Sequence, residues 1–218
     1  MSSSASILAL AMACAPGVAP TTIEAIIDVE SKGNVLAIGV NRGGRLSRQP
    51  ANYAEAVAWA EWLLNSGKNF DAGLMQINST NWRRLGLTPQ NVFDPCTNVR
   101  AGARILTDNY VNAARSLGPG RNALLAALSA YNTGNRTAGF RNGYVAKVNN
   151  AAARKAGVPA PLIPMPSPAQ GSTRSPTSTQ RSTRPMGGVA PAPAWQGGTA
   201  WGITSTVEQA TSSKETAE

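Results

Sequence analysis

The first 158 residues carry apolar positions at helical spacing, in segments separated by glycine, proline and capping residues. Asp94 followed by Pro95 is typical of a helix start, and Gly118 is typical of its end. The pattern predicts helices at residues 6–14, 20–31, 52–67, 79–86, 94–118, 121–134 and 142–157. Alternating β-branched runs are short, so we expect any strand within 34–49 or 68–77. The predicted fold class is all-α: six to eight short helices with at most a minor β-hairpin.

The predicted helix at residues 20–31 has a carboxylate on its apolar face. Thr21 and Glu24 have the spacing of a capping box, so we expect Glu24 in solvent. Three isoleucines define the buried stripe, and the next position on it is Glu30. Burial and the negative end of the helix dipole should raise its pKa, which suits a general acid at neutral pH. The alternative is a structural glutamate paired with an arginine.

The composition changes near residue 159. Nine of the 15 prolines lie in residues 159–218, among Ser, Thr, Gly and Ala and with little periodicity. Such a segment cannot bury enough apolar area to offset its chain entropy. We therefore expect a folded domain at 1–158 and a disordered tail at 159–218, in which Trp195 and Trp201 are candidate anchors for a partner.

The formal net charge is +9, and the excess lies in residues 1–158, with 16 Lys and Arg against 8 Asp and Glu. An excess of this kind favours an anionic partner, such as a nucleic acid, a lipid or an acidic polymer, or serves solubility alone. No predicted helix carries several basic residues on one face beside exposed aromatics, and no nucleic-acid motif is present. We therefore expect no nucleic-acid partner.

Histidine is absent, which excludes Ser–His and Cys–His nucleophile pairs and His-containing zinc sites. Two cysteines cannot hold a metal alone, so we expect no metal and no cofactor, and acid–base chemistry from Asp, Glu, Lys or Tyr. Cys14 and Cys96 either remain buried thiols or form one disulfide. In the chain-entropy model that disulfide contributes about 4 kcal/mol, and it requires an oxidising compartment.

The start of the chain has a mixed signal. Residues 6–14 resemble the apolar part of a secretion signal, but no basic residue precedes them. We interpret them as a first helix and expect no clear cleavable signal peptide. No stretch of the sequence is long enough to cross a membrane.

Three motifs occur in order along the chain: Glu30–Ser31 at a helix end, Gly73–Ile77 with the pattern Gly-x-x-Gln-Ile, and Ala-Tyr-Asn at Ala130–Asn132. Together they resemble the soluble lytic transglycosylases, over about residues 5–155. Within that group the chain is most similar to the peptidoglycan-cleaving subunit of type IV secretion and conjugation systems. The resemblance implies a lysozyme-like α-rich fold and an enzyme of the Gram-negative periplasm that acts on glycan strands.

The resemblance also implies the reaction, which is cleavage of the β-1,4 bond between N-acetylmuramic acid and N-acetylglucosamine with a 1,6-anhydromuramyl product. Glu30 would protonate the leaving oxygen and then remove a proton from the muramyl 6-hydroxyl. Tyr131 would hydrogen-bond and orient Glu30. Ser31 would help to position the N-acetyl group, and Asn132 would support the site through hydrogen bonds.

The segment around the second motif would form the floor of the sugar groove. Gln76 and the backbone beside it, including Met75, would bind the sugar, and Gly73 would let the backbone approach the glycan. Asn78 is a departure, because many relatives have a second methionine there. Asp71 resembles the second carboxylate of animal lysozymes, so a lysozyme-type hydrolase is the alternative activity. We favour Asp71 as a loop residue that bonds backbone N–H groups.

Residues 41–50 are rich in Gly and Arg, and we expect a flexible flap or groove edge there, since they fit no nucleotide-binding motif. Basic residues near a groove would hold the carboxylates of peptidoglycan. The resemblance further implies contacts with components of a type IV secretion system, for which the tail is a candidate contact. A basic binding protein without catalysis is the alternative of another class.

Overall fold

The computed structural model describes residues 4–157, which are mostly helical, and confirms the α-rich prediction. The helices are α1 Ser4–Cys14, α2 Pro20–Glu30, α3 Tyr53–Asn65, α4 Trp82–Leu85, α5 Pro95–Leu117, α6 Arg121–Thr133, α7 Ala138–Arg141 and α8 Tyr144–Ala156, with a 3-10 turn, η1, at Ser79–Asn81. The predicted tail and its two tryptophans lie outside the described residues. Within residues 4–157, no helix has both the length and the apolarity needed to cross a membrane.

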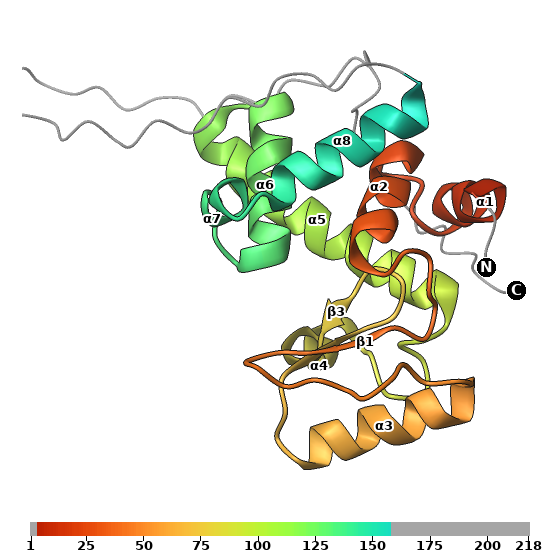
Figure 1. The fold of residues 1–218 in the computed structure, drawn as a ribbon. Coiled ribbons are helices and arrows are strands. Elements are labelled where there is room, and N and C mark those ends of the chain that lie inside the picture. Colours follow the sequence, from red (N-terminus) through yellow and green to blue (C-terminus); the bar gives the residue numbers. More distant parts are fainter. Residues whose placement is uncertain (1–3, 158–218) are drawn as a thin grey trace, which may run out of the picture.

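Three short strands form one antiparallel sheet in the order β1, β2, β3: Ile38–Val40, Phe70–Ala72 and Ile77–Asn78. They fall in the two windows that the sequence allowed, except that β3 extends one residue further. Figure 1 shows the sheet with α3 and α4 on one side of the molecule, the helices α1, α2, α6, α7 and α8 on the other, and α5 between them. The sheet and the helices thus face each other across the middle of the molecule.

The core is built from the apolar stripes that the sequence predicts. The isoleucines of α2 are fully buried, and α2 packs against α8 while α5 packs against α6. Beneath the sheet, Phe70 and Trp82 meet edge to face at 5.2 Å, and the indole N–H of Trp82 donates to the carbonyl of Ile77 at 3.0 Å. Burial of each such side chain contributes about 1.5–3 kcal/mol to the stability of the fold, so both halves of the molecule are stabilised by their own buried side chains.

Two predicted helix caps are present, and one is wrong. The side chains of Asn52 and Asp94 accept from backbone N–H groups three residues later, at 3.0 and 2.8 Å. The capping box at Thr21 and Glu24 does not form, because α2 begins at Pro20 without a side-chain cap. Glu24 is buried rather than solvated, and its carboxylate lies 3.9 Å from the ammonium of Lys155 in α8.

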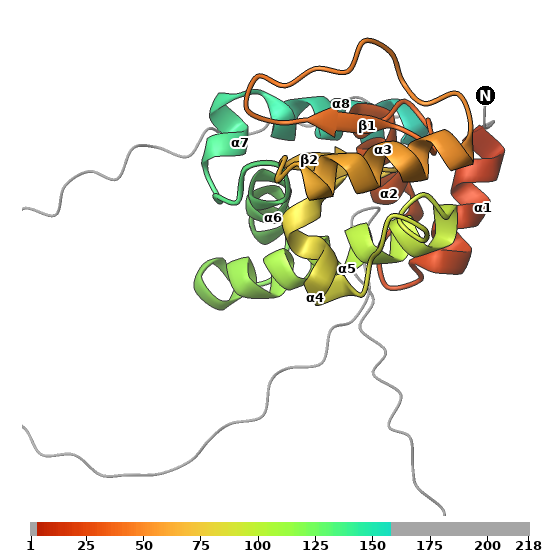
Figure 2. The same ribbon diagram turned by 90° about the horizontal axis from the view of Figure 1, so that it is seen from below.

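The connection from β1 to α3 arches away from the body of the molecule (Figure 2). Its far end is fixed by Gln49, whose side chain bonds both backbone groups of Ile38, accepting from the N–H at 2.8 Å and donating to the carbonyl at 3.0 Å. This contact closes the loop against the edge of the sheet.

Cys14 and Cys96 form a disulfide, so the disulfide alternative holds. It joins the last residue of α1 to the second residue of α5. The two residues are 82 positions apart, and the chain between them contains α2, the whole sheet, α3 and α4.

Candidate active site

A groove of about 500 Å³ lies between the sheet and the helices α5 and α6. Six of the residues singled out in the sequence line it: Glu30, Asp71, Gln76, Asn78, Tyr131 and Asn132. Three others, Ser31, Gly73 and Met75, do not. The motifs therefore converge on one surface, although they lie on elements far apart in the sequence.

Glu30 is the last residue of α2, at the position where the buried stripe of that helix meets the groove. Burial raises the pKa of Glu30, the hydrogen bond from Tyr144 lowers it, and the negative charge of Asp71 raises it; the result is a pKa of about 7. No arginine among the described residues pairs with this carboxylate. At neutral pH Glu30 is therefore divided between the acid and the carboxylate form.

The hydrogen bond to Glu30 comes from a residue that the sequence analysis missed. The hydroxyl of Tyr144, the first residue of α8, donates to Oε1 of Glu30 at 2.5 Å. Tyr144 is buried, and burial raises the pKa of its phenol, so the group stays protonated and remains a donor. No motif marks Tyr144, because the contact joins residues 114 positions apart.

The predicted hydrogen bond between Tyr131 and Glu30 is wrong. The hydroxyl of Tyr131 donates instead to the backbone carbonyl of Met75 at 2.8 Å, which ties α6 to the turn between β2 and β3. Burial is the main cause that raises the pKa of Tyr131, and the nearby charge of Glu30 raises it further. Tyr131 therefore lines the groove close to the glutamate and supports its floor.

A chain of amide contacts links Asn132 to Tyr144, the residue that donates a hydrogen bond to Glu30. The side-chain N–H of Asn142 donates to Oδ1 of Asn132 at 2.9 Å, and Oδ1 of Asn142 accepts from the backbone N–H of Tyr144 at 3.0 Å. The end of α6 thereby fixes the start of α8, and with it the phenol that contacts Glu30.

Asp71 belongs to the sheet and not to a loop, which corrects the interpretation that we favoured. Its carboxylate accepts from the side-chain amides of Asn41 at 2.9 Å and Asn78 at 2.8 Å, and no backbone N–H within residues 4–157 bonds it. Asn69 holds both amides in place through side-chain hydrogen bonds of 2.7 and 3.0 Å. Burial raises the pKa of Asp71, while the two amide donors lower it. The sheet thus presents a fixed second carboxylate to the groove.

Gly73 serves packing and not the approach of a ligand. It is buried, has a φ of +81°, and a Cβ there would lie 2.1 Å from Nδ2 of Asn98. Asn98 is fully buried in α5 and bonds the carbonyls of Ala72 and Val92 and the N–H of Met75, at 3.0, 2.8 and 2.8 Å. Glycine is required here because α5 lies directly against the turn.

The side chains of three further predicted site residues contact other parts of the protein: Met75, Ser31 and Gln76. The side chain of Met75 is buried in the core and contacts the surface of Gly102 in α5. The hydroxyl of Ser31 donates to the carbonyl of Ile27 at 3.3 Å, as a helix-end residue does. Gln76 lines the groove, but its amide N–H donates to the carbonyls of Ala37 and Gly73 at 3.0 and 2.9 Å.

The fold and the groove agree with what the chain resembles. A model of the Transglycosylase SLT domain family matches residues 8–153, which include Glu30, Asp71, Tyr131 and Tyr144. The chain belongs to this family.

Curated relatives of this SLT domain protein carry the name virB1. The type IV secretion system protein virB1 of Brucella suis biovar 1 is 44% identical over 164 residues, 72% of this chain and 68% of the relative. Protein virB1 of Agrobacterium fabrum is 42% identical over 139 residues, 64% of this chain and 56% of the relative. The chain therefore spans between about half and two thirds of these relatives. No solved structure matches it.

The far end of the groove in this SLT domain protein is charged. Asp108 of α5 lines it and pairs with Arg84 at 3.0 Å and with Arg104 at 2.9 Å. Both arginines satisfy Asp108, which makes it a structural carboxylate rather than a second acid. In residues 4–157 no group of three or more acidic or cysteine side chains is placed to hold a metal ion.

Proposed function

We propose that this chain is a peptidoglycan lytic transglycosylase that cleaves the β-1,4 bond between N-acetylmuramic acid and N-acetylglucosamine. The observation that carries the proposal is Glu30, a carboxyl with a pKa of about 7 in a groove of about 500 Å³. A general acid works best when its pKa is near the operating pH, and here burial supplies the shift.

The reaction uses Glu30 twice. As an acid it donates its proton to the glycosidic oxygen while the bond from that oxygen to C1 of the muramyl residue breaks. As a carboxylate it then takes the proton of the muramyl 6-hydroxyl, and the hydroxyl oxygen bonds to C1. The proton count closes, no water is consumed, and Glu30 is ready for another cycle.

Tyr144 sets the direction of Glu30 in both steps. Its hydrogen bond holds Oε1, so Oε2 is the oxygen that is left for the sugar. A donor also stabilises the carboxylate that forms after the first proton transfer. Gln76 and Asn132, on opposite walls of the groove, are the groups that we assign to sugar binding.

The name of the Brucella relative, a type IV secretion system protein, supports a role for this chain in such a system. We infer that the enzyme acts in the periplasm and opens the cell wall locally for assembly of a type IV secretion apparatus. The disulfide is consistent with an oxidising compartment, where such bonds persist. The basic surface suits the anionic wall polymer.

A second candidate is a lysozyme-type hydrolase in which Asp71 takes part. The observation that favours it is that Asp71 lines the same groove and that its charge raises the pKa of Glu30. In such an enzyme the second carboxylate stabilises or attacks C1, and water then completes hydrolysis. The two candidates differ in their products and in their need for Asp71.

The test compares the full chain with the variants Glu30→Gln and Asp71→Asn on purified peptidoglycan, with released fragments weighed by mass spectrometry. We expect fragments one water lighter than hydrolytic products, a loss of about 10³-fold in Glu30→Gln, and activity remaining in Asp71→Asn. Reducing-end products that disappear in Asp71→Asn would establish the hydrolase instead. Equal release from the wild type and Glu30→Gln would reject both candidates.

A further inference from the structure

A second cavity, of about 460 Å³, lies beside the groove. It is formed by the loop after β1 and the C-terminal end of α3, and four long side chains define it: Arg42, Arg45, Trp62 and Lys68. We call it the side pocket. Asn41 lines both the side pocket and the groove, so the two are continuous along the sheet edge.

The side pocket is positively charged and uncompensated. No Asp or Glu lines it, and no side-chain hydrogen bond or ion pair connects Arg42, Arg45 or Lys68 with any residue of the described part of the chain. By contrast, Arg48 on the same loop is bound to Glu55. Three adjacent cations without a carboxylate repel one another, and a bound anion relieves that repulsion.

The backbone presents Arg42 at a local cost. Arg42 has a φ of +56° and Gly43 a φ of +79°, and the N–H of Gly44 donates to the carbonyl of Asn41 at 3.3 Å. Two consecutive residues with positive φ are usually Asn or Gly, since a longer side chain costs about 1 kcal/mol there. An arginine at this turn is therefore better explained by a ligand than by the fold.

Trp62 gives the side pocket an apolar wall. It is 59% exposed, while Trp59, one turn earlier on α3, is covered by the guanidinium of Arg48 at 5.1 Å. An exposed indole beside cations suits a ligand that combines carboxylates with small apolar side chains. An inorganic phosphate would use the cations but would leave the indole uncovered.

We propose that the side pocket binds the short acidic peptide that peptidoglycan carries on the lactyl group of its muramyl residues. The inference rests on the proposed function, because a muramyl residue in the groove brings its peptide to the groove edge. Asn41 lies at the passage between the two sites. The enzyme therefore distinguishes peptide-bearing glycan from glycan whose peptides have been removed.

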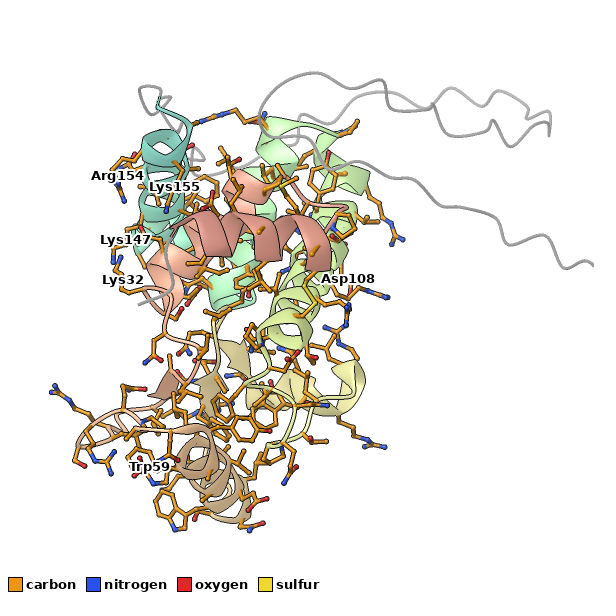
Figure 3. All side chains as sticks on the ribbon, turned by 90° about the vertical axis from the view of Figure 1, so that its right-hand side faces the viewer. Lys32, Trp59, Asp108, Lys147, Arg154 and Lys155 are labelled. Atoms are coloured by element: carbon orange, nitrogen blue, oxygen red, sulfur yellow. A yellow bond between two sulfur atoms is a disulfide. The ribbon has the colours of Figure 1, made fainter. Side chains whose placement is uncertain are left out.

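The test measures binding of the full chain in a Glu30→Gln background, with peptide-bearing glycan strands and with the same strands after amidase has removed the peptides. The side-pocket variant is Arg42→Asn, Arg45→Gln, Lys68→Gln, where Asn suits the positive φ. The matched control, Arg83→Gln, Arg115→Gln, Lys147→Gln, removes the same charge from exposed positions on α4, α5 and α8. Figure 3 shows Lys147 on the other half of the molecule from Trp59.

We expect the Glu30→Gln chain to bind peptide-bearing strands about tenfold more tightly, since each of three exposed ion pairs contributes a fraction of 1 kcal/mol. The side-pocket variant should lose this preference and the control should keep it. Trp62→Ala alone should lower the preference, which guards against misfolding of the triple variant. Equal affinity for the two glycans, or the same loss in the control, overturns the inference.

Cleavage of both glycans by the wild-type chain separates this inference from the proposed function. Failure to cleave, with the binding preference intact, rejects the catalytic proposal alone. Cleavage without a preference rejects the side pocket alone. A binding preference that persists in the side-pocket variant also rejects the side-pocket inference. The three cations would then serve another anionic partner, such as an acidic protein segment.

Discussion

The pKa of Glu30 results from opposing contacts, of which one can be removed cleanly. The phenol of Tyr144 lowers it against burial and the charge of Asp71. In Tyr144→Phe we expect the pKa of Glu30 to rise above 7, because the carboxylate loses its donor while the carboxyl stays buried. The alkaline limb of kcat/KM should move to higher pH, and kcat should fall about tenfold as orientation is lost. A pH–rate profile of the full chain measures both effects.

Tyr131→Phe is the matched control for that variant. It also removes one hydroxyl from the groove wall, but that hydroxyl is bonded to the carbonyl of Met75 and not to Glu30. We expect reduced activity without the alkaline shift. A shift in Tyr131→Phe, with none in Tyr144→Phe, would contradict the assignment of Tyr144 as the residue that positions Glu30.

At the scale of elements, the groove depends on one buried side chain that joins α5 to the sheet. Asn98 bonds three buried backbone groups: the carbonyl of Ala72 at the end of β2, the N–H of Met75 in the turn after it, and the carbonyl of Val92 in the segment before α5. Asn98→Ala leaves those groups unpaired and opens a void beside Gly73, so we expect the free energy of unfolding to fall by about 3 kcal/mol. Urea unfolding at neutral pH measures the change.

Asn150→Ala provides the comparison for Asn98→Ala. Asn150 is exposed in the middle of α8, where alanine is a better helix former, so its replacement should change stability by less than about 0.5 kcal/mol. Equal effects of the two variants would mean that the bonds of Asn98 to the turn contribute nothing measurable.

The elements show which parts of this molecule are local enough to be predicted. The helices other than the four-residue α7, the caps at Asn52 and Asp94, and the inward position of Glu30 follow from neighbours within one or two turns, and the structure has them. The strands are two or three residues long, too short to leave a pattern. Tyr144 could not be found in this way, because the contact with Glu30 exists only after α2 and α8 have packed.

The role of the glycine at position 73 could not be predicted for the same reason, because it depends on an element that is distant in the sequence. The motif predicted that this glycine lets the backbone approach the glycan, but its reason is a close approach of α5, and nothing in the neighbouring sequence records that approach. The amides that hold Asp71 are likewise distributed over all three strands or their ends. Sequence reasoning therefore selected six residues that line one groove and missed the contacts that shape it.

At the scale of the whole molecule, the disulfide encloses the part of the chain that carries Glu30 and Asp71, two of the three carboxylates that line the groove. The loop between Cys14 and Cys96 holds Glu30, the entire sheet with Asp71, and the turn that Tyr131 supports. Closing a loop of this length restricts the unfolded chain, a contribution of about 4 kcal/mol in the chain-entropy model. Most of that stabilisation should therefore disappear when the bond is absent.

The last prediction concerns that bond in the variant Cys14→Ala, Cys96→Ala. We expect its free energy of unfolding to be lower by about 2–4 kcal/mol, seen as a lower urea midpoint than that of the oxidised wild type. Reductant should bring the wild type to a similar midpoint and leave the variant unchanged, since the variant has no thiol. If the urea midpoint of the wild type does not change with reductant, then the packing of α1 on α2 and α5, and not the disulfide, holds this part of the molecule together.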